Sequence, residues 1–118
     1  MSALTANPAA QADSLISSGQ RVIRIETEAL VAMQARIGPA FAEASRELLG
    51  CRGRVVCTGM GKSGHIATKI AATLSSTGTA AFFLHPGEAS HGDLGMVKDD
   101  DIVLMLSNSG ETEEILTI

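Results

Sequence analysis

The N-terminal part of the chain carries apolar residues at a helical spacing. Ile16, Ile23 and Leu30 recur every seven residues, and polar side chains occupy positions between them. This period predicts a long amphipathic helix that starts near Asp13. Residues 1–12 lack the period and are small or polar, so we expect them to form a disordered lead-in.

A second, shorter helix is expected after the break at Gly38–Pro39. Its apolar side includes Leu48, and Gly50 is a suitable residue to follow its last turn. Residues 13–50 would therefore form a helical leader. A long helix with an apolar stripe needs a surface to cover it, and two alternatives stay open: the leader packs on its own domain or on a partner subunit.

Beyond this leader the pattern alternates between short apolar runs and helical spacing. The runs expected to be buried strands are residues 54–58, 80–84 and 102–106. A helix is expected over residues 64–77 with Ser63 as its N-cap, its apolar side formed by Ile66, Ile70 and Leu74. A further helix should begin near Glu111, and the sequence ends within it. Alternation of this kind predicts an α/β fold, a parallel β-sheet flanked by helices, over residues 51–118. We expect this domain to be truncated.

Composition narrows the classes of function. Three Phe with no Trp or Tyr predict a core of aliphatic side chains, and a net charge of −4 disfavours nucleic-acid binding. An anionic small molecule remains possible, because backbone dipoles bind phosphate in acidic proteins too. Cys51 and Cys57 lack zinc-ligand spacing and are expected to be free thiols. With no long apolar stretch, the protein is expected to be cytoplasmic.

The glycine-rich segment Gly59–Gly64 follows the first expected strand. It matches GxGxxG, but a dinucleotide site also needs a carboxylate at the end of the second strand, where Leu84–Pro86 has none. A Walker A loop is excluded because Val56 occupies a required glycine position. Lys62 beside a helix N-terminus is electrostatically unfavourable, and an anionic ligand would reverse that sign. The alternative is a tight turn with a solvated lysine.

Two more polar segments follow the other strands. Residues 107–112 place hydroxyl and amide side chains where they can cradle a phosphate dianion, although simple helix capping would also explain them. Residues 85–95 contain two histidines and two carboxylates, and His91 could move a proton. His65 is expected to be structural. All three segments should meet at the carboxyl edge of a parallel sheet.

These residues carry a family resemblance. The string GMGKSGHIATKIAATLSSTGTAAFFLHPGEASHGDLGMV, followed by SNSGETEEI, resembles the arabinose-5-phosphate isomerase family, whose core is a sugar isomerase (SIS) domain. The resemblance implies a flavodoxin-like three-layer sandwich. It also implies interconversion of D-ribulose 5-phosphate and D-arabinose 5-phosphate through an enediol, for octulosonate in lipopolysaccharide or capsule. No redox cofactor is required, and the family forms homotetramers.

The resemblance and the residue types together nominate a set of site residues. The expected catalytic residues are Lys62, Glu114 and His91, with either Glu114 or His91 as the base. The expected substrate-binding residues are Ser63, Gly78, Thr79, His85, Ser107, Asn108, Ser109 and Thr112. The resemblance also implies that His85 can take up an inhibitory zinc ion. Two alternatives stay open: a non-catalytic SIS module that senses a sugar phosphate, and an SIS isomerase for another ketose phosphate.

Overall fold

The computed structural model describes residues 7–89 and 91–111, and the chain divides into two compact units. The first unit is Met1–Ala42 and the second is Glu43–Ile118. The helix expected near Glu111 falls outside the described residues.

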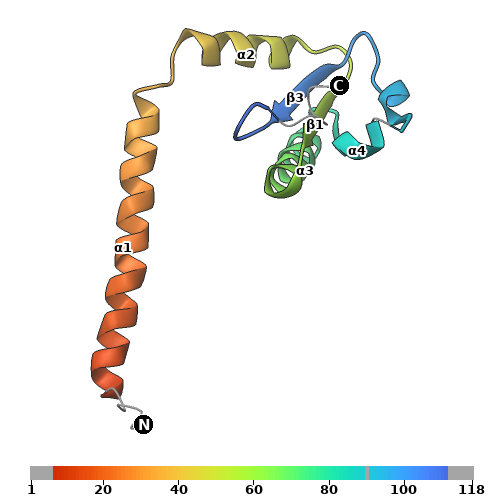
Figure 1. The fold of residues 1–118 in the computed structure, drawn as a ribbon. Coiled ribbons are helices and arrows are strands. Elements are labelled where there is room, and N and C mark those ends of the chain that lie inside the picture. Colours follow the sequence, from red (N-terminus) through yellow and green to blue (C-terminus); the bar gives the residue numbers. More distant parts are fainter. Residues whose placement is uncertain (1–6, 90, 112–118) are drawn as a thin grey trace. The chain divides into compact units, whose positions relative to one another are not determined.

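Helix α1 (Pro8–Gln34) makes up most of the first unit (Figure 1). It begins before Asp13, because the side chain of Asn7 accepts a hydrogen bond from the Ala9 amide and Pro8 suits the first helical position. Residues 8–12 are therefore helical, contrary to the expected lead-in. The alanines of this segment favour a helix without any apolar period, which is why the pattern missed them.

The apolar side chains of α1 are exposed. None of its residues is buried, and Leu15, Ile23 and Leu30 each keep at least 60% of their surface accessible. These positions belong to the stripe that the sequence predicted. The helix ends at Gln34, just before the break expected at Gly38–Pro39.

Helix α2 (Pro39–Gly50) includes Gly50 as its last residue. Leu48 packs against the core of the second unit, whereas its neighbour Leu49 is 87% exposed. The helix therefore contributes a single large side chain to this core.

The second unit contains three parallel strands, as the sequence predicted. They are β1 (Val55–Gly59), β2 (Ala81–Phe83) and β3 (Ile102–Leu106), in the spatial order β2-β1-β3. The central strand β1 is buried throughout, and Val55 lies opposite Ala81 on one side and Ile102 on the other. This position explains its continuous apolar run.

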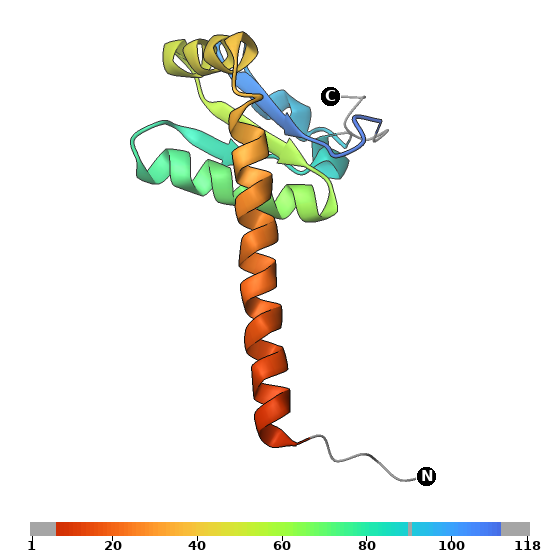
Figure 2. The same cartoon turned by 90° about the vertical axis from the view of Figure 1, so that its left-hand side faces the viewer.

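Helix α3 (Gly61–Ser76) runs along one face of this sheet (Figure 2). Its buried residues are Gly64, Ala67 and Ala71, whereas Ile66, expected on this side, is exposed. Small side chains let the helix lie close to the sheet, and the larger Ile70 and Leu74 fill its flanks. The sequence pattern placed the large apolar residues on the buried side of the helix. Because the helix packs closely on the sheet, small residues form that side instead.

Two short helices that the sequence pattern did not predict follow β2, and the first of them packs on the opposite face. They are α4 (Pro86–Ala89) and the 3₁₀ helix η1 (Asp93–Met96). Ala89 packs with Val56 and Leu84 in a second core cluster. A single helical turn is too short to show a period, so this segment looked like a polar loop. With helices on both faces, the fold class is the expected flanked parallel sheet.

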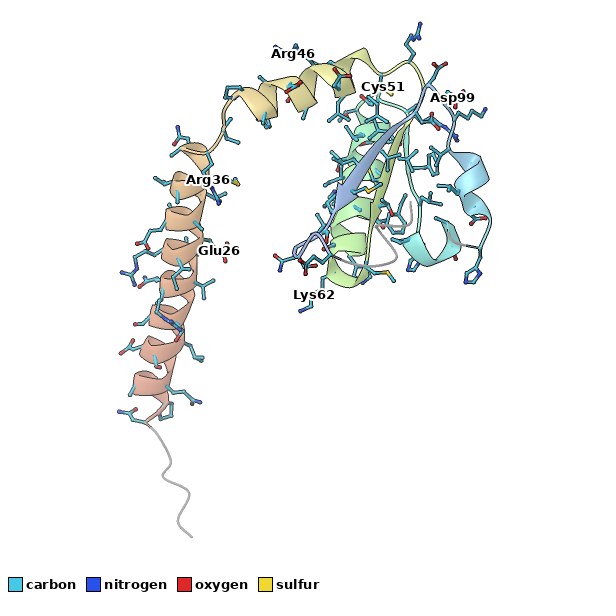
Figure 3. The ribbon with its side chains drawn as sticks, turned by 45° about the horizontal axis from the view of Figure 1, so that its top comes forward. Glu26, Arg36, Arg46, Cys51, Lys62 and Asp99 are labelled. Carbon is cyan, nitrogen blue, oxygen red and sulfur yellow. The ribbon has the colours of Figure 1, made fainter. Side chains whose placement is uncertain are left out.

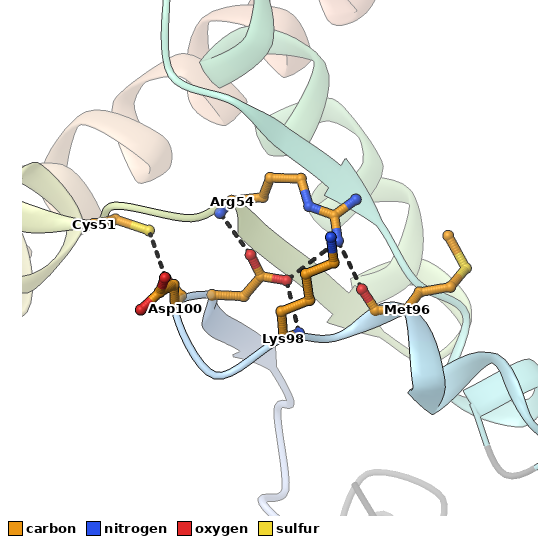
Figure 4. Close-up of polar contacts among 6 residues, drawn as sticks. Cys51, Arg54, Met96, Lys98 and Asp100 are labelled. Atoms are coloured by element: carbon orange, nitrogen blue, oxygen red, sulfur yellow. Dashed lines mark hydrogen bonds and ion pairs between the residues drawn. The ribbon is translucent and has the colours of Figure 1, made fainter.

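A polar cluster closes the amino edge of the sheet (Figure 4). The carboxylate of Asp101 accepts hydrogen bonds from the main-chain amides of Arg54 at 2.7 Å and Lys98 at 3.0 Å. The Arg54 guanidinium lies 3.3 Å from the same carboxylate, donates to the Met96 carbonyl and stacks 4.5 Å from the ring centre of Phe82. The Asp101 side chain is almost fully buried, and this cluster ties the end of η1 to the starts of β1 and β3.

We expect an Asp101→Asn variant to lower the melting temperature by on the order of 10 °C at neutral pH, because an amide cannot accept all of these hydrogen bonds. Hydrogen bonds from the amides of Lys98 and then Arg54 hold the pKa of Asp101 below its ordinary value of 3.8. Because the pKa is lowered on folding, the charged carboxylate stabilises the fold at every pH above the ordinary pKa of 3.8. This stabilisation is lost as the pH falls from that value through the pKa of the folded state. The difference in melting temperature between parent and variant should therefore be full above about pH 5 and should begin to shrink below about pH 4. A gap that is constant down to about pH 2 would contradict the role of the charge.

The cysteines agree with a further expectation. Cys57 is buried and Cys51 half-buried, both as free thiols, and burial raises the pKa of Cys57.

Within residues 7–89 and 91–111, no helix combines the length and the apolar character needed to cross a membrane.

Candidate functional site

The three polar segments follow the carboxyl ends of the three strands, as predicted. Parallel pairing of β1 with β2 and β3 brings these ends to one edge of the sheet. Figure 3 shows Lys62 at this edge and Cys51 and Asp99 at the opposite one. The topology therefore brings the glycine-rich turn, the histidine loop and the serine loop to a common edge.

The turn from β1 into α3 depends on close backbone contact. A Cβ atom on Gly64 would lie 2.5 Å from the Gly59 carbonyl oxygen, and Gly61 has a φ of +53°. The helix begins at Gly61, with Met60 as N-cap and no capping side chain. Ser63 is therefore inside the first turn, and its expected role as N-cap is wrong. The earlier start follows from Gly61, which adopts a backbone conformation that other residues rarely take.

Lys62 is exposed in the first turn of α3. The amides of this turn carry the positive end of the helix dipole, and among the residues that the structure describes no side chain caps them. Lys62 and these amides together form a positive surface at the carboxyl edge of the sheet.

A cavity of about 210 Å³ lies beside this turn, between α3 and the end of β2. Its lining residues are Gly59, Gly61, Gly64, His65, Thr68, Phe83 and His85. It includes His85, which we expect to bind substrate, and also His65, which was expected to be structural. His65 is four residues after Gly61 and three before Thr68, so helical spacing places all three on one face. That spacing is the signal that could have identified it.

The histidine loop holds its two histidines differently. The ring of His85 is perpendicular to that of Phe83, with 6.3 Å between ring centres, and its Nδ1 accepts a hydrogen bond from the Gly87 amide at 3.1 Å. His91 is exposed, its amide donates to the Glu88 carbonyl, and it does not line the cavity. Only His85 is therefore brought to the glycine-rich turn.

The serine loop is held by its own side chains. The Ser107 hydroxyl accepts a hydrogen bond from the Gly110 amide at 2.9 Å, and the Ser109 hydroxyl accepts one from the Glu111 amide at 3.2 Å. These contacts are of the kind that caps a helix or stabilises a turn. They do not exclude phosphate binding at this loop, so both interpretations stay open. Asn108 is exposed between the two serines. Thr112 and Glu114 fall outside the described residues.

Gly78 and Thr79 lie at the opposite, amino edge of the sheet. Helix α3 runs antiparallel to the strands, so the turn after its end, where Gly78 has a φ of +100°, is far from its first turn, which contains Lys62. Both residues line a separate cavity with Leu48 and Cys51. Within one chain, these two expected substrate contacts do not join the other site residues.

A larger cavity, about 640 Å³, also opens at the amino edge. Its lining holds three basic and three acidic residues, and two pairs of them are close: Arg52 lies 3.7 Å from Asp100, and Arg54 lies 3.3 Å from Asp101. Because bases and acids balance here, the carboxyl edge remains the better candidate for an anionic ligand.

Known proteins similar to this chain include arabinose 5-phosphate isomerases. The arabinose 5-phosphate isomerase KdsD of Pseudomonas aeruginosa is 59% identical over 103 residues, covering 87% of this chain and 32% of that protein. KdsD of Yersinia pestis is 57% identical over 101 residues, covering 86% of this chain and 31% of that protein. The chain therefore spans about a third of these relatives' length.

A solved structure shares the fold over most of the chain. The structure of Escherichia coli CFT073 c3406 in complex with arabinose 5-phosphate matches with a TM-score of 0.78 and 48% identity, covering 89% of this chain and 56% of that one. The SIS domain family matches residues 48–118, which include the sheet, both of its helical layers and the three loops. The chain belongs to the SIS domain family.

Proposed function

We propose that the protein carrying this sequence interconverts D-ribulose 5-phosphate and D-arabinose 5-phosphate. The observation that carries the proposal is the joint presence, at one sheet edge, of the Lys62 turn, the His85 loop and the serine loop, in a chain 59% identical to an arabinose 5-phosphate isomerase. The likeness to the structure in complex with arabinose 5-phosphate supports the same substrate class.

The substrate's phosphate would bind at the serine loop. The side chains of Ser107, Asn108, Ser109 and Thr112 are of types that can donate to phosphate oxygens after β3. Ser63 and the amides of the first turn of α3 offer further donors at the same edge. A dianion there would also offset the unfavourable placement of Lys62 at a helix N-terminus.

The sugar end would then lie toward the cavity beside α3. Aldose–ketose isomerisation removes a proton from one carbon, passes through an enediol and returns a proton to the adjacent carbon. Glu114 or His91 would transfer this proton. Lys62 would stabilise the negative charge that develops on the carbonyl oxygen, and His85 would hold a substrate oxygen.

An assembly of several copies fits the position of Gly78 and Thr79. They lie at the edge opposite Lys62, so they can contact substrate at this site only if another copy presents them. The exposed apolar stripe of α1 offers surface for such an assembly. We propose a homo-oligomer in the cytoplasm, a tetramer as in the family, acting in octulosonate synthesis.

The direct test is an isomerase assay on the full-length polypeptide that carries this sequence. Ribulose 5-phosphate should be converted to arabinose 5-phosphate, with little turnover of glucose 6-phosphate or heptulose phosphates. Binding of these esters without turnover would indicate a sensing module instead. Turnover of only a hexulose or heptulose phosphate would identify a different SIS isomerase.

A further inference from the structure

The hydrogen bond between Gly87 and His85 determines where the His85 ring carries its proton. A main-chain amide can only donate, and the Gly87 amide lies 3.1 Å from His85 Nδ1. Nδ1 must therefore present a lone pair, and the neutral ring carries its proton on Nε2. The remaining polar atom of the ring is thus an N–H donor.

Three features hold this arrangement in place. Gly87 lies in the first turn of α4, where helix amides have no partner within the helix. A Cβ atom on Gly87 would lie 3.2 Å from Nδ1 and 3.4 Å from Cε1 of His85, so the ring packs closely on a position without a side chain. On its other side, the edge-to-face contact with Phe83 orients the ring where it lines the cavity.

We infer that Gly87 is a positioning residue that fixes His85 as an Nε2–H hydrogen-bond donor to an oxygen acceptor in the cavity beside α3. Given the proposed function, on which this ligand class rests, the acceptor is a carbonyl or hydroxyl oxygen of the sugar phosphate. His85 then orients the substrate and does not take up its proton.

The same hydrogen bond disfavours zinc at His85. Coordination through Nε2 requires a lone pair there, which moves the proton to Nδ1 and sets two N–H donors against each other at Gly87. Within the part of the chain that the structure describes, no group of three or more His, Cys, Asp or Glu side chains could complete such a site. The described residues therefore do not fit the inhibitory zinc ion that the resemblance implies.

Nitrogen NMR of this chain tests the tautomer without any substrate. Long-range ¹H–¹⁵N spectra at pH 8 should show His85 with a protonated Nε2 and an unprotonated Nδ1. One equivalent of zinc should leave both signals in place. In Gly87→Ala the ring should be displaced and the two tautomers should mix. A protonated Nδ1 in the parent, or a His85 signal shifted by zinc, would overturn the inference whatever the enzyme's activity.

Two substitutions at His85 separate donation from other roles in the full-length polypeptide. His85→Gln can place an N–H near the position of Nε2, whereas the shorter amide of His85→Asn reaches only the position of Nδ1. We expect kcat/KM to fall about tenfold further in the Asn variant than in the Gln variant, with the difference mainly in KM. Equal loss in both variants, with KM unchanged, would contradict the donor role. Absence of any isomerase activity in the parent would count against the proposed function and leave the NMR result standing.

Discussion

Replacing Lys62 with Ala should lower kcat of the full-length isomerase by roughly 10²–10³-fold, the usual cost of removing one group that stabilises a developing oxyanion. Lys62 is exposed in the first turn of α3, and among the described residues it forms no ion pair. Its removal therefore costs the fold little. The loss should appear in kcat, because negative charge on the substrate oxygen develops in the transition state. A coupled assay with ribulose 5-phosphate measures it directly.

Lys69 provides the matched control. It is also an exposed lysine on α3, but it lies about two turns further along, away from the N-terminus of the helix. Lys69→Ala should keep turnover within about twofold of the parent, since surface substitutions away from a site rarely matter. Equal losses of turnover in the two variants would indicate that the net charge of the protein, and not the position of Lys62, causes the effect. Near-parental turnover in Lys62→Ala, with an unchanged melting temperature, would remove Lys62 from the mechanism.

The parallel sheet was predictable because its strands are short, continuous apolar runs. The bounds of β3 match the prediction completely, and β1 is shifted from its predicted range by one residue at each end. The layers over the sheet were harder to predict. The buried side of α3 is set by how closely its backbone approaches β1, and this selects Gly64, Ala67 and Ala71 over the larger Ile66. The hydrophobicity of the side chains alone does not indicate how closely the helix approaches the strand.

The edge that carries the site was predictable for a topological reason, since parallel strands must place their following loops together. Which residues meet within the edge depends on local geometry. His65 lines the cavity, although we expected a structural role from its place just after the start of the helix. Gly87 gave no sign in the sequence that its amide would bond to His85. Gly78 and Thr79 were expected as substrate contacts from the family resemblance. They lie at the other edge because α3 runs antiparallel to the strands.

A Gly64→Ala substitution should destabilise the second unit by about 1–3 kcal/mol or more, the usual range for overpacking a close contact. The added Cβ would lie 2.5 Å from the Gly59 carbonyl oxygen, which is main chain and cannot rotate away as a side chain would. An alanine inside a helix normally stabilises it relative to glycine by up to about 1 kcal/mol, so a loss would have the opposite sign to helix propensity. Urea unfolding followed by circular dichroism measures the change through the midpoint.

The matched control is Gly95→Ala, since nothing lies within 4 Å of a Cβ atom at that position of η1. The free energy of unfolding of this variant, derived from its urea midpoint, should differ from that of the parent by no more than about 0.5 kcal/mol. Gly64 also lines the cavity with His85, so the shift of α3 away from β1 should weaken sugar-phosphate binding in parallel with the loss of stability. If Gly64→Ala proved as stable as the parent, α3 would have room to move from β1, and the close approach that shapes the cavity would not be a requirement of this fold.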